Sequence, residues 1–355
     1  MKLTKRMRNL LSSNFFTKLR AWEYWPYHLI YTPIYCYWLI LSIRARAFMF
    51  FAGANPGIFL GGFFMESKNE ILSKVPIDMV PVSAYFPPQS SPEVILSWMD
   101  EKSLSFPIIA KPDKGERGFL VELLHSELAL IDYLEKNKVE LIIQEYIDYP
   151  VEVGVLYYRF PDSKEGAISS FTLKRFLSVT GDGKSTLRQL ILDYPRAKLQ
   201  LEVLEKSDPK QMRSIPEKGV EVPLVAIGNH SRGTTFLNGE HLIDQDLLDL
   251  FNRISGQIDG IYFGRFDIRC KSIEDLKAGR NFKILEINGV KSEPTHIYEP
   301  GFSLWKAYGV LFRQWNTIYR ISMMNKARGF QFPSFRVGIR TLKAFLKYRR
   351  CASRS

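Results

Sequence analysis

The pattern of apolar and polar positions changes character at about residue 106. Before it lie two long apolar stretches, residues 22–43 and 48–64. After it, short apolar runs are separated by polar turns and amphipathic segments, a pattern that predicts strands and helices in alternation. We expect strands at 107–112, 119–124, 141–146, 262–270 and 281–287, a hairpin over 150–176, and helices over 126–137, 185–206, 245–258 and 302–325. The fold class predicted from residue 106 onward is therefore α/β (α+β).

The same pattern predicts four parts of the chain. These are a basic and aromatic membrane-associating segment (1–64), a connector punctuated by prolines (65–105), the α/β domain (106–300), and C-terminal helices with a basic tail (301–355). With 46% apolar and 24% charged residues, the chain can bury a core and is not expected to be disordered. Its three cysteines form no CxxC pair, which argues against a disulfide framework or a zinc site and fits a reducing compartment.

The first apolar stretch approaches the ~20 residues that a membrane-spanning helix needs. It also contains Glu23, Pro26, His28 and Pro33, and it is crowded with Trp and Tyr, which favour the headgroup level of a bilayer. We expect a peripheral anchor or a single span on the cytoplasmic side of a membrane. The alternative is an aromatic face that packs against the soluble body.

The formal net charge of +12 is concentrated at the two ends. Residues 1–20 carry six basic residues and residues 331–355 carry seven, and neither segment has an acid. Basic segments attract anionic lipid or nucleic acid, but here the aromatic residues lie in an apolar run rather than among the cations, which favours lipid. Residues 334–350 are basic and amphipathic, a pattern typical of a helix on an anionic surface, although a solvated basic tail is the alternative.

Candidate chemistry gathers first at two expected strand ends. Arg265 and Asp267 lie on one strand, and Glu286 and Asn288 lie on the next. Because side chains alternate along a strand, each pair shares a face. Two carboxylates and an amide oxygen are ligands that suit Mg²⁺, with Mn²⁺ as a second choice, and Arg265 could stabilise charge on a transferring phosphoryl group. The alternative is a set of polar residues on the exposed face of a hairpin.

A lysine and a glycine loop form the second candidate unit. Lys111 ends an apolar strand and precedes a loop that contains Gly115, Arg117 and Gly118. Glycines let backbone N–H groups fold over phosphates, and Lys111 would supply a positive charge to them. The loop is not a Walker A motif, since it lacks GK[ST] and no helix follows directly. A plain hairpin turn is the alternative.

The next strand end could meet the rest of a nucleotide. Glu145, Tyr146 and Ile147 can offer backbone groups to an adenine edge, and Glu152 is placed to accept hydrogen bonds from ribose hydroxyls.

Two later polar loops combine glycines, hydroxyls and cations, which suits loops that close over phosphate or a bound acid. Residues 174–186 begin with Lys174 and Arg175 and continue into GDGKST, and residues 229–235 include Arg232. For the GDGKST run, the alternative is a turn followed by a helix N-cap at Ser185 or Thr186.

In this order and spacing, the units resemble those of ATP-grasp ligases. Residues 106–121 resemble the strand, lysine and glycine loop of the D-alanine–D-alanine ligase group, and Glu145 and Glu152 resemble its adenine and ribose contacts. Residues 181–186 with 229–235 look closer to cyanophycin synthetase and to the ligase domain of bifunctional glutathione synthetases. The resemblance covers about residues 106–300, and it equates the phosphate-binding arginine and the magnesium ligands of the family with Arg265, Asp267, Glu286 and Asn288.

The sequence departs from the dipeptide ligases in two places. After Asn288 it reads Gly-Val-Lys-Ser-Glu-Pro rather than Asn-Thr-Ser-Pro-Gly. The N-terminal substrate domain of those ligases is missing or reduced to residues 65–105.

The resemblance implies a fold of two α+β subdomains that clasp ATP. It also implies an ATP- and Mg²⁺-dependent ligase that activates a carboxylate as an acylphosphate and joins it to an amine. Arg265, with Lys174 or Arg175, would stabilise the charge, and Lys291, Glu293 and His296 are candidates to contact the second substrate. The expected partners are small-molecule carboxylates and amines and a membrane surface, with no nucleic acid. The alternatives are a non-catalytic ATP-binding membrane protein and a kinase-like phosphotransferase.

Overall fold

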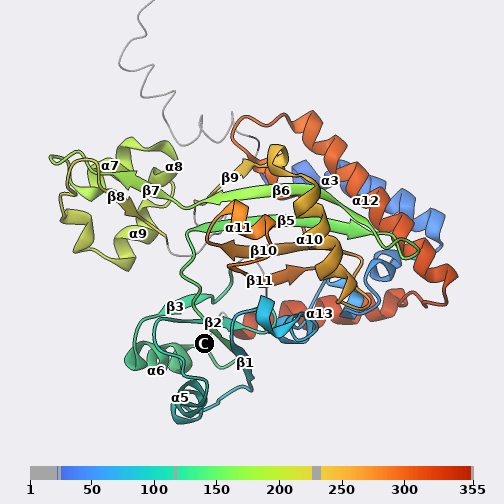
Figure 1. The fold of residues 1–355 in the computed structure, drawn as a ribbon, viewed down its shortest axis with the longest axis horizontal. Coiled ribbons are helices and arrows are strands. Elements are labelled where there is room, and N and C mark those ends of the chain that lie inside the picture. The colour runs from blue at the N-terminus through green and yellow to red at the C-terminus, as the bar shows by residue number, and fades with distance from the viewer. Residues whose placement is uncertain (1–21, 23–24, 116–117, 226–232, 353–355) are drawn as a thin grey trace, which may run out of the picture.

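The computed structural model describes residues 22, 25–115, 118–225 and 233–352. Arg117, Arg232 and the basic residues of 1–20 therefore lie outside the described residues. The strands form two larger antiparallel sheets and one small sheet, with helices around them (Figure 1). The expected mixture of α and β elements is confirmed.

The four-stranded sheet has the order β1 (Ser83–Phe86), β4 (Leu141–Glu145), β2 (Ile108–Pro112), β3 (Glu122–Leu124). Two helices, α5 (Pro92–Glu101) and α6 (Glu127–Lys136), bury Ile95, Leu130 and Tyr133 against it. β1 and α5 come from residues 65–105, so the segment expected to be a connector contributes a strand and a helix. β3 is shorter than the expected strand over 119–124, because Leu120 adopts a left-handed turn conformation with φ of 52°.

The five-stranded sheet has the order β11 (Phe282–Asn288), β10 (Phe263–Cys270), β5 (Val151–Arg159), β6 (Gly166–Arg175), β9 (Thr235–Asn238). On one face lie α10 (Gln245–Gly256) and α11 (Ile273–Lys277) (Figure 1). The amphipathic α10 buries Leu247, Phe251 and Ile254 in a core that includes Phe266 and Ile268 of β10. Since side chains alternate along β10, Arg265, Asp267 and Arg269 belong to the opposite face.

Two long helices, α3 (Tyr27–Ala45) and α12 (Leu304–Ala327), pack against each other next to this sheet. Ile34 of α3 is buried in one cluster with Leu311 of α12, and Leu41 is buried in another with Ile318. Among the described helices, none combines the length and the apolar character required to cross a bilayer.

The second apolar stretch is part of the protein core. It forms η2 (Phe50–Ala54), in which every residue is buried, and η3 (Phe59–Gly61). Asn55 ties it to β10, because its side chain accepts hydrogen bonds from the N–H groups of Tyr262 and Phe263 and donates to the carbonyl of Phe263. Most of residues 48–64 therefore pack against the rest of the protein, as the alternative to a membrane anchor predicted.

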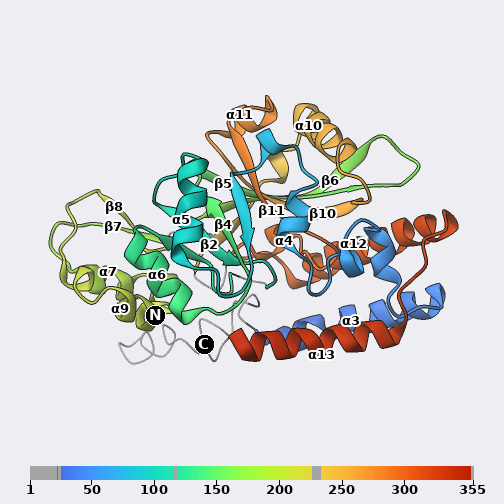
Figure 2. The ribbon, with the colours of Figure 1, turned by 90° about the horizontal axis from the view of Figure 1, so that it is seen from below.

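The basic C-terminal stretch forms α13 (Phe335–Ala352), which lies along the same side of the molecule as α3 (Figure 2). Its Phe345 is buried and contacts Phe64, whereas Phe335, Ile339 and Leu346 stay exposed. Other short helices among the described residues are α4 (Lys68–Leu72), η4 (Ile77–Met79), η5 (Gln211–Arg213), η7 (Glu240–Leu242) and η8 (Thr295–Tyr298).

A small lobe, at the left of Figure 1, contains β7 (Ser178–Thr180), β8 (Glu221–Pro223), α7 (Leu187–Asp193), α8 (Pro195–Lys198) and α9 (Leu201–Ser207). The prediction of a single helix over 185–206 is therefore wrong, because three short helices occupy this range. Pro195 occupies the first turn of α8, where its missing N–H is tolerated, and it cannot continue α7. Of the two expected N-caps, Thr186 is the one observed, in a capping box with Gln189.

Candidate active site

A cavity of about 500 Å³ lies between the two larger sheets, and we call it the cleft. It brings together residues that are far apart along the chain, as the hydrogen bond between Lys111 and the carbonyl of Leu285, 174 positions away, shows. The candidate residues that line it are Lys111, Gly115, Gly118, Glu145, Tyr146, Ile147, Glu152, Lys174, Arg265, Asp267, Glu286, Asn288, Lys291 and Glu293.

The acidic wall of the cleft comes from β10 and β11. In the antiparallel register Asp267 stands opposite Glu286, and Arg265 stands opposite Asn288. The register shifts just after Asp267, so that Leu285 and Glu286 both line the cleft. The expected meeting of these side chains from two neighbouring strands is thus observed.

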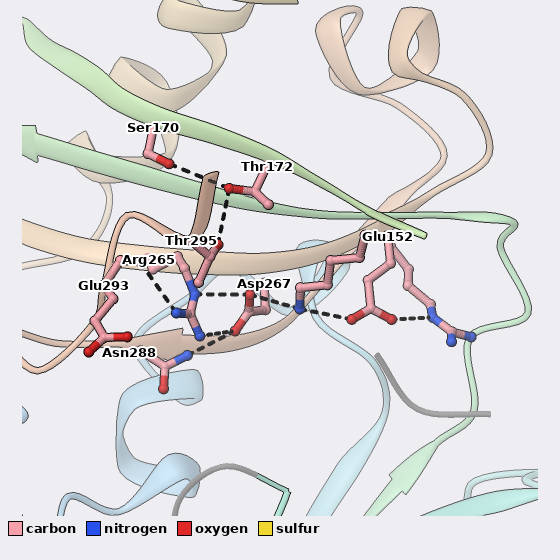
Figure 3. Close-up of polar contacts among 10 residues, drawn as sticks. Glu152, Ser170, Thr172, Arg265, Asp267, Asn288, Glu293 and Thr295 are labelled. Atoms are coloured by element: carbon pink, nitrogen blue, oxygen red, sulfur yellow. Dashed lines mark hydrogen bonds and ion pairs between the residues drawn. The ribbon is translucent and has the colours of Figure 1, made fainter. Parts of the chain in front are cut away.

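Asp267 is the centre of a charged network (Figure 3). Its carboxylate lies 3.0 Å from Lys174 Nζ and 3.0 Å from an amino nitrogen of Arg265, and it accepts a 2.9 Å hydrogen bond from Asn288 Nδ2. Burial opposes the charge, but the two cations outweigh it and lower the pKa of Asp267 to about 2. Asp267 therefore remains ionised at neutral pH.

The network continues through Glu152, which is buried between two cations. One carboxylate oxygen accepts from Lys174 Nζ at 2.9 Å, and the other accepts from Arg269 Nε at 3.0 Å. Although burial disfavours the charge of Lys174, the carboxylates of Asp267 and Glu152 hold its pKa above the usual value. Glu152 thus positions two protein cations, and because each carboxylate oxygen has two lone pairs it can still accept from a further hydroxyl group.

The opposite wall carries Lys111 at the end of β2. Its ammonium group is buried, donates to Gln144 Oε1 at 2.9 Å and to the carbonyl of Leu285 at 3.2 Å, and makes no ion pair shorter than 4 Å among the described residues. Burial is the main cause that lowers the pKa of Lys111 to about 8. Gln144 Nε2 is buried and lacks a hydrogen-bond partner in the described part of the chain, so a ligand acceptor would satisfy it.

The glycine loop is held from the side by a lysine that the sequence did not single out. Lys68 Nζ of α4 donates to the carbonyl of Gly115 at 2.6 Å and lies 3.9 Å from a carboxylate oxygen of Glu286. Gly115 and Gly118 have positive φ values of 142° and 72°, which side chains rarely adopt. Lys68 has no sequence signal, because only the tertiary fold brings α4 to the loop.

The strand end expected to meet adenine is fixed by Arg269. This guanidinium donates to the carbonyl of Ile147 at 2.7 Å and lies 5.3 Å from the centre of the Tyr146 ring. The Glu145 carboxylate accepts from the N–H of Val82 at 3.0 Å. The alternation along β10 could have identified Arg269, because it is two residues beyond Asp267.

Three expectations need correction. Arg175 follows Lys174 on β6, so its exposed side chain belongs to the other face and does not line the cleft. His296 is buried, its Nδ1 shares a 2.6 Å hydrogen bond with Ser170, and it does not line the cleft either. Residues 181–186 form the turn and N-cap that were the alternative, since Asp182 accepts from the N–H groups of Lys184 and Ser185.

The donor set suits Mg²⁺ that arrives with phosphate. Asp267, Glu286 and Asn288 offer the hard oxygen ligands that Mg²⁺ prefers. Among the described residues, however, no group of three or more His, Cys, Asp or Glu side chains is arranged to hold a metal ion alone. Two carboxylates and an amide fit an ion that takes its remaining ligands from water and phosphate oxygens.

No protein-family model matches the chain, and no curated protein matches it in sequence. Among solved structures it is similar to a bifunctional glutathione synthetase from Pasteurella multocida, at 16% identity and a TM-score of 0.36 over 69% of this chain and 35% of that one. It is also similar to the VanG D-Ala:D-Ser ligase from Enterococcus faecalis, at 14% identity and a TM-score of 0.40 over 70% and 61% of the two chains.

A third similar structure is a D-alanine–D-alanine ligase from Bacillus anthracis, at 15% identity and a TM-score of 0.42 over 74% of this chain and 69% of that one. The chain thus spans about a third of the length of the glutathione synthetase and less than two thirds of that of the D-Ala:D-Ser ligase. The three similar structures are all ATP-grasp ligases, the group that the order of motifs in this sequence resembles.

Proposed function

We propose that this protein is an ATP- and Mg²⁺-dependent ligase that activates a carboxylate as an acylphosphate and joins it to an amine. One observation carries the proposal. Three buried or half-buried cations, Lys111, Lys174 and Arg265, converge in one cleft on an acidic pair, Asp267 and Glu286. That arrangement suits a polyphosphate that brings its own metal ion.

The nucleotide would lie between the two sheets. In this proposal Lys111, Lys68 and the Nε2 group of Gln144, which line the cleft, would bind phosphate oxygens, and the backbone at Glu145–Ile147 would meet adenine. Asp267, Glu286 and Asn288 would hold Mg²⁺, which neutralises the phosphates and aligns the in-line displacement when it is bound.

The chemistry balances in two steps. A carboxylate oxygen attacks the γ-phosphorus of ATP, ADP leaves, and an acylphosphate forms. The amine nitrogen then attacks the acyl carbon, phosphate leaves, and the amine loses a proton. Arg265 and Lys174 stabilise the negative charge of the transferring group. The Glu293 carboxylate accepts hydrogen bonds from Tyr31 and Tyr298 and is the candidate to hold the amine.

Replacing Glu286 with Gln tests the metal wall. We expect ADP release with a responsive acid and amine to fall by at least about 100-fold, because one of the two metal-binding charges is lost. The matched control is Glu274→Gln, which changes an exposed glutamate on α11, in the connection between the same two strands. Undiminished ADP release by the Glu286→Gln protein would falsify the proposed function.

The same assay separates the alternatives. A non-catalytic ATP-binding protein would bind Mg-ATP without releasing ADP for any acid. A phosphotransferase would release ADP but leave the phosphoryl group on the product, whereas a ligase releases free phosphate in equal amount.

We also propose that the enzyme works at an anionic membrane surface. In support, α3 exposes Leu29 and Ile40, with 60% and 53% of their surfaces accessible. The basic α13 lies along the same side of the molecule as α3 (Figure 2) and exposes Phe335 and Leu346. Liposome flotation tests it. Leu29→Glu/Ile40→Glu should reduce flotation with anionic vesicles, whereas Leu128→Glu, an exposed leucine on α6, should not. Equal flotation of the two variants would remove the support from α3.

A further inference from the structure

A second cavity, of about 390 Å³, lies beside the cleft, and we call it the side cavity. The two cavities share six lining residues: Tyr31, Gly115, Phe119, Lys291, Ser292 and Glu293. These shared residues form a junction, which means that the side cavity lies directly beside the cleft.

The walls of the side cavity are mostly apolar. Helix α3 contributes Ile34 and Trp38, helix α12 contributes Leu311 and Trp315, and helix α13 contributes Phe345. The buried Val290, two residues after the candidate metal ligand Asn288, also lines it. An apolar cavity of this size favours hydrocarbon or aromatic groups over water, which would find few hydrogen-bond partners there.

Two buried polar atoms at the side cavity indicate a ligand. Gln314 is about nine-tenths buried, and its Nε2 donates to the carbonyl of Ser292 at 2.7 Å. Its Oε1 has no hydrogen-bond partner among the described residues, and neither has the buried Nε1 of Trp38. Unsatisfied buried polar atoms are rare in native proteins, so these two groups suit a molecule with a few polar atoms on an apolar body.

The charge at the junction favours an acid. Lys291 Nζ lies 5.2 Å from the centre of the Phe64 ring and 5.4 Å from that of Phe345, at the boundary between the cavities. Arg349 of α13 adds a second cation on the side-cavity wall, 5.9 Å from the ring of Phe119.

Of the described residues that line the side cavity, Glu293 is the one that is acidic, and its carboxylate already accepts hydrogen bonds from Tyr31 and Tyr298. Two cations against this single carboxylate suit an anionic group carried on an apolar body.

We infer that the side cavity binds the apolar body of the acid substrate and holds its carboxylate at Lys291, facing the cleft. The substrate class is therefore an amphiphilic carboxylic acid with an alkyl or aryl chain. This inference rests on the proposed function and deepens it, since it says which of the two substrates enters from the side of α3 and α13. It also gives the aromatic N-terminal segment a part in the site, because Tyr31, Ile34 and Trp38 of α3 line the side cavity.

Chain length provides the first test. Straight-chain acids from butanoate to dodecanoate are titrated into the full-length protein with Mg-ADP, below their micelle concentrations, and binding is followed by calorimetry and by the fluorescence of Trp38 and Trp315. We expect affinity to rise about four-fold per methylene, the equivalent of about 0.8 kcal/mol, until the cavity is full. Alkylamines of the same lengths are the comparison. An equal or stronger length dependence for the amines, or none for the acids, would overturn the inference.

Filling the cavity provides the second test. Ile34→Trp places a larger ring in the side cavity and should weaken decanoate binding by at least ten-fold while Mg-ATP still binds. Ile77→Trp is the matched control, because Ile77 is 89% exposed and lies far from the cavity in η4. Leu311→Phe fills the same space from α12, and it replaces Ile34→Trp in this test if the Ile34→Trp protein does not fold. Equal decanoate affinities of the cavity-filling and control variants would contradict the inference.

These outcomes differ from those that would overturn the proposed function. If Mg-ATP binds normally and Glu286→Gln abolishes ADP release, but chain length and Ile34→Trp have no effect on acid binding, then the ligase assignment stands and the side cavity has another role. If ADP release does not depend on Glu286, the ligase assignment fails whatever the acids do.

Discussion

Two buried lysines face the cleft from different sheets, and their surroundings differ. Lys174, on the five-stranded sheet, lies within 3.0 Å of two carboxylates, Asp267 and Glu152, and its pKa is raised. Lys111, on the four-stranded sheet, donates to neutral oxygens of Gln144 and Leu285, and burial lowers its pKa to about 8.

This difference separates a cation whose charge the protein already compensates from one whose charge it leaves uncompensated. The charge of Lys174 is compensated by the protein, so its removal leaves carboxylates unpaired. The charge of Lys111 has no such close partner, and a phosphate group would supply one. The four-stranded sheet therefore offers a cation that becomes fully stabilised only when an anion binds.

The largest expected effect is on stability. Lys174→Met should lower the free energy of unfolding by about 3–5 kcal/mol, because Asp267 and Glu152 lose a buried partner. Lys111→Met should leave it unchanged or raise it, because a buried charge with only neutral close partners is removed. Urea unfolding of the two variants measures the difference, with the surface variant Lys136→Met as the control. Equal losses of unfolding free energy in the two variants would contradict the proposed difference between the two lysines.

Next in size is the effect on nucleotide binding. Lys111→Met should weaken Mg-ATP binding by about 10- to 100-fold, the loss expected for a charge-assisted hydrogen bond to phosphate. Calorimetric titration measures it. The matched variant Lys114→Met changes a lysine three positions along, which pairs with Glu140 at 3.4 Å, and should bind nearly as the parent protein does. A wild-type affinity for Lys111→Met would remove Lys111 from the site.

The pH dependence follows from the depressed pKa of Lys111. In the free protein this lysine loses its proton near pH 8, so Mg-ATP affinity should be flat below that value and fall by up to about ten-fold per pH unit above it. The unfolded chain keeps the proton until the ordinary lysine pKa, so between these values Lys111 makes the free energy of unfolding rise with pH. Lys111→Arg should abolish the fall in affinity. An affinity of the parent protein that stays constant up to pH 9 would contradict the assigned environment.

The smallest expected effect is that of a substitution that gives Lys111 a carboxylate neighbour like those of Lys174. Gln144→Glu places a carboxylate where Lys111 now donates to an amide oxygen, and it should raise the pKa of Lys111. We expect Mg-ATP binding to weaken by about ten-fold or less at pH 7 and to lose its pH dependence between pH 7 and 9. Binding titrations across that range measure both. If the fall above pH 8 persists in this variant, Lys111 is not the group that titrates.

The sequence alone determined the local parts of the site. Period-two alternation on two strands placed Arg265 with Asp267 and Glu286 with Asn288, and the structure confirms that each pair shares the cleft face. The same alternation would have found Arg269 and excluded Arg175, had it been followed along both strands. Capping and proline rules hold for Thr186 and Pro195, because those signals depend only on neighbouring residues.

Only the tertiary structure decided which distant elements meet. Lys68, Gln144 and Tyr31 line the cleft because α4, β4 and α3 are folded against it, and no pattern within those elements indicates that contact. Most of the apolar residues of 48–64 are packed in the core, while Phe48 and Phe59 are exposed. Hydrophobicity measures a preference to leave water and does not say whether protein or lipid will cover the surface. Charge behaves likewise: a lysine in the sequence has one ordinary pKa, and its neighbours in space move that pKa down for Lys111 and up for Lys174.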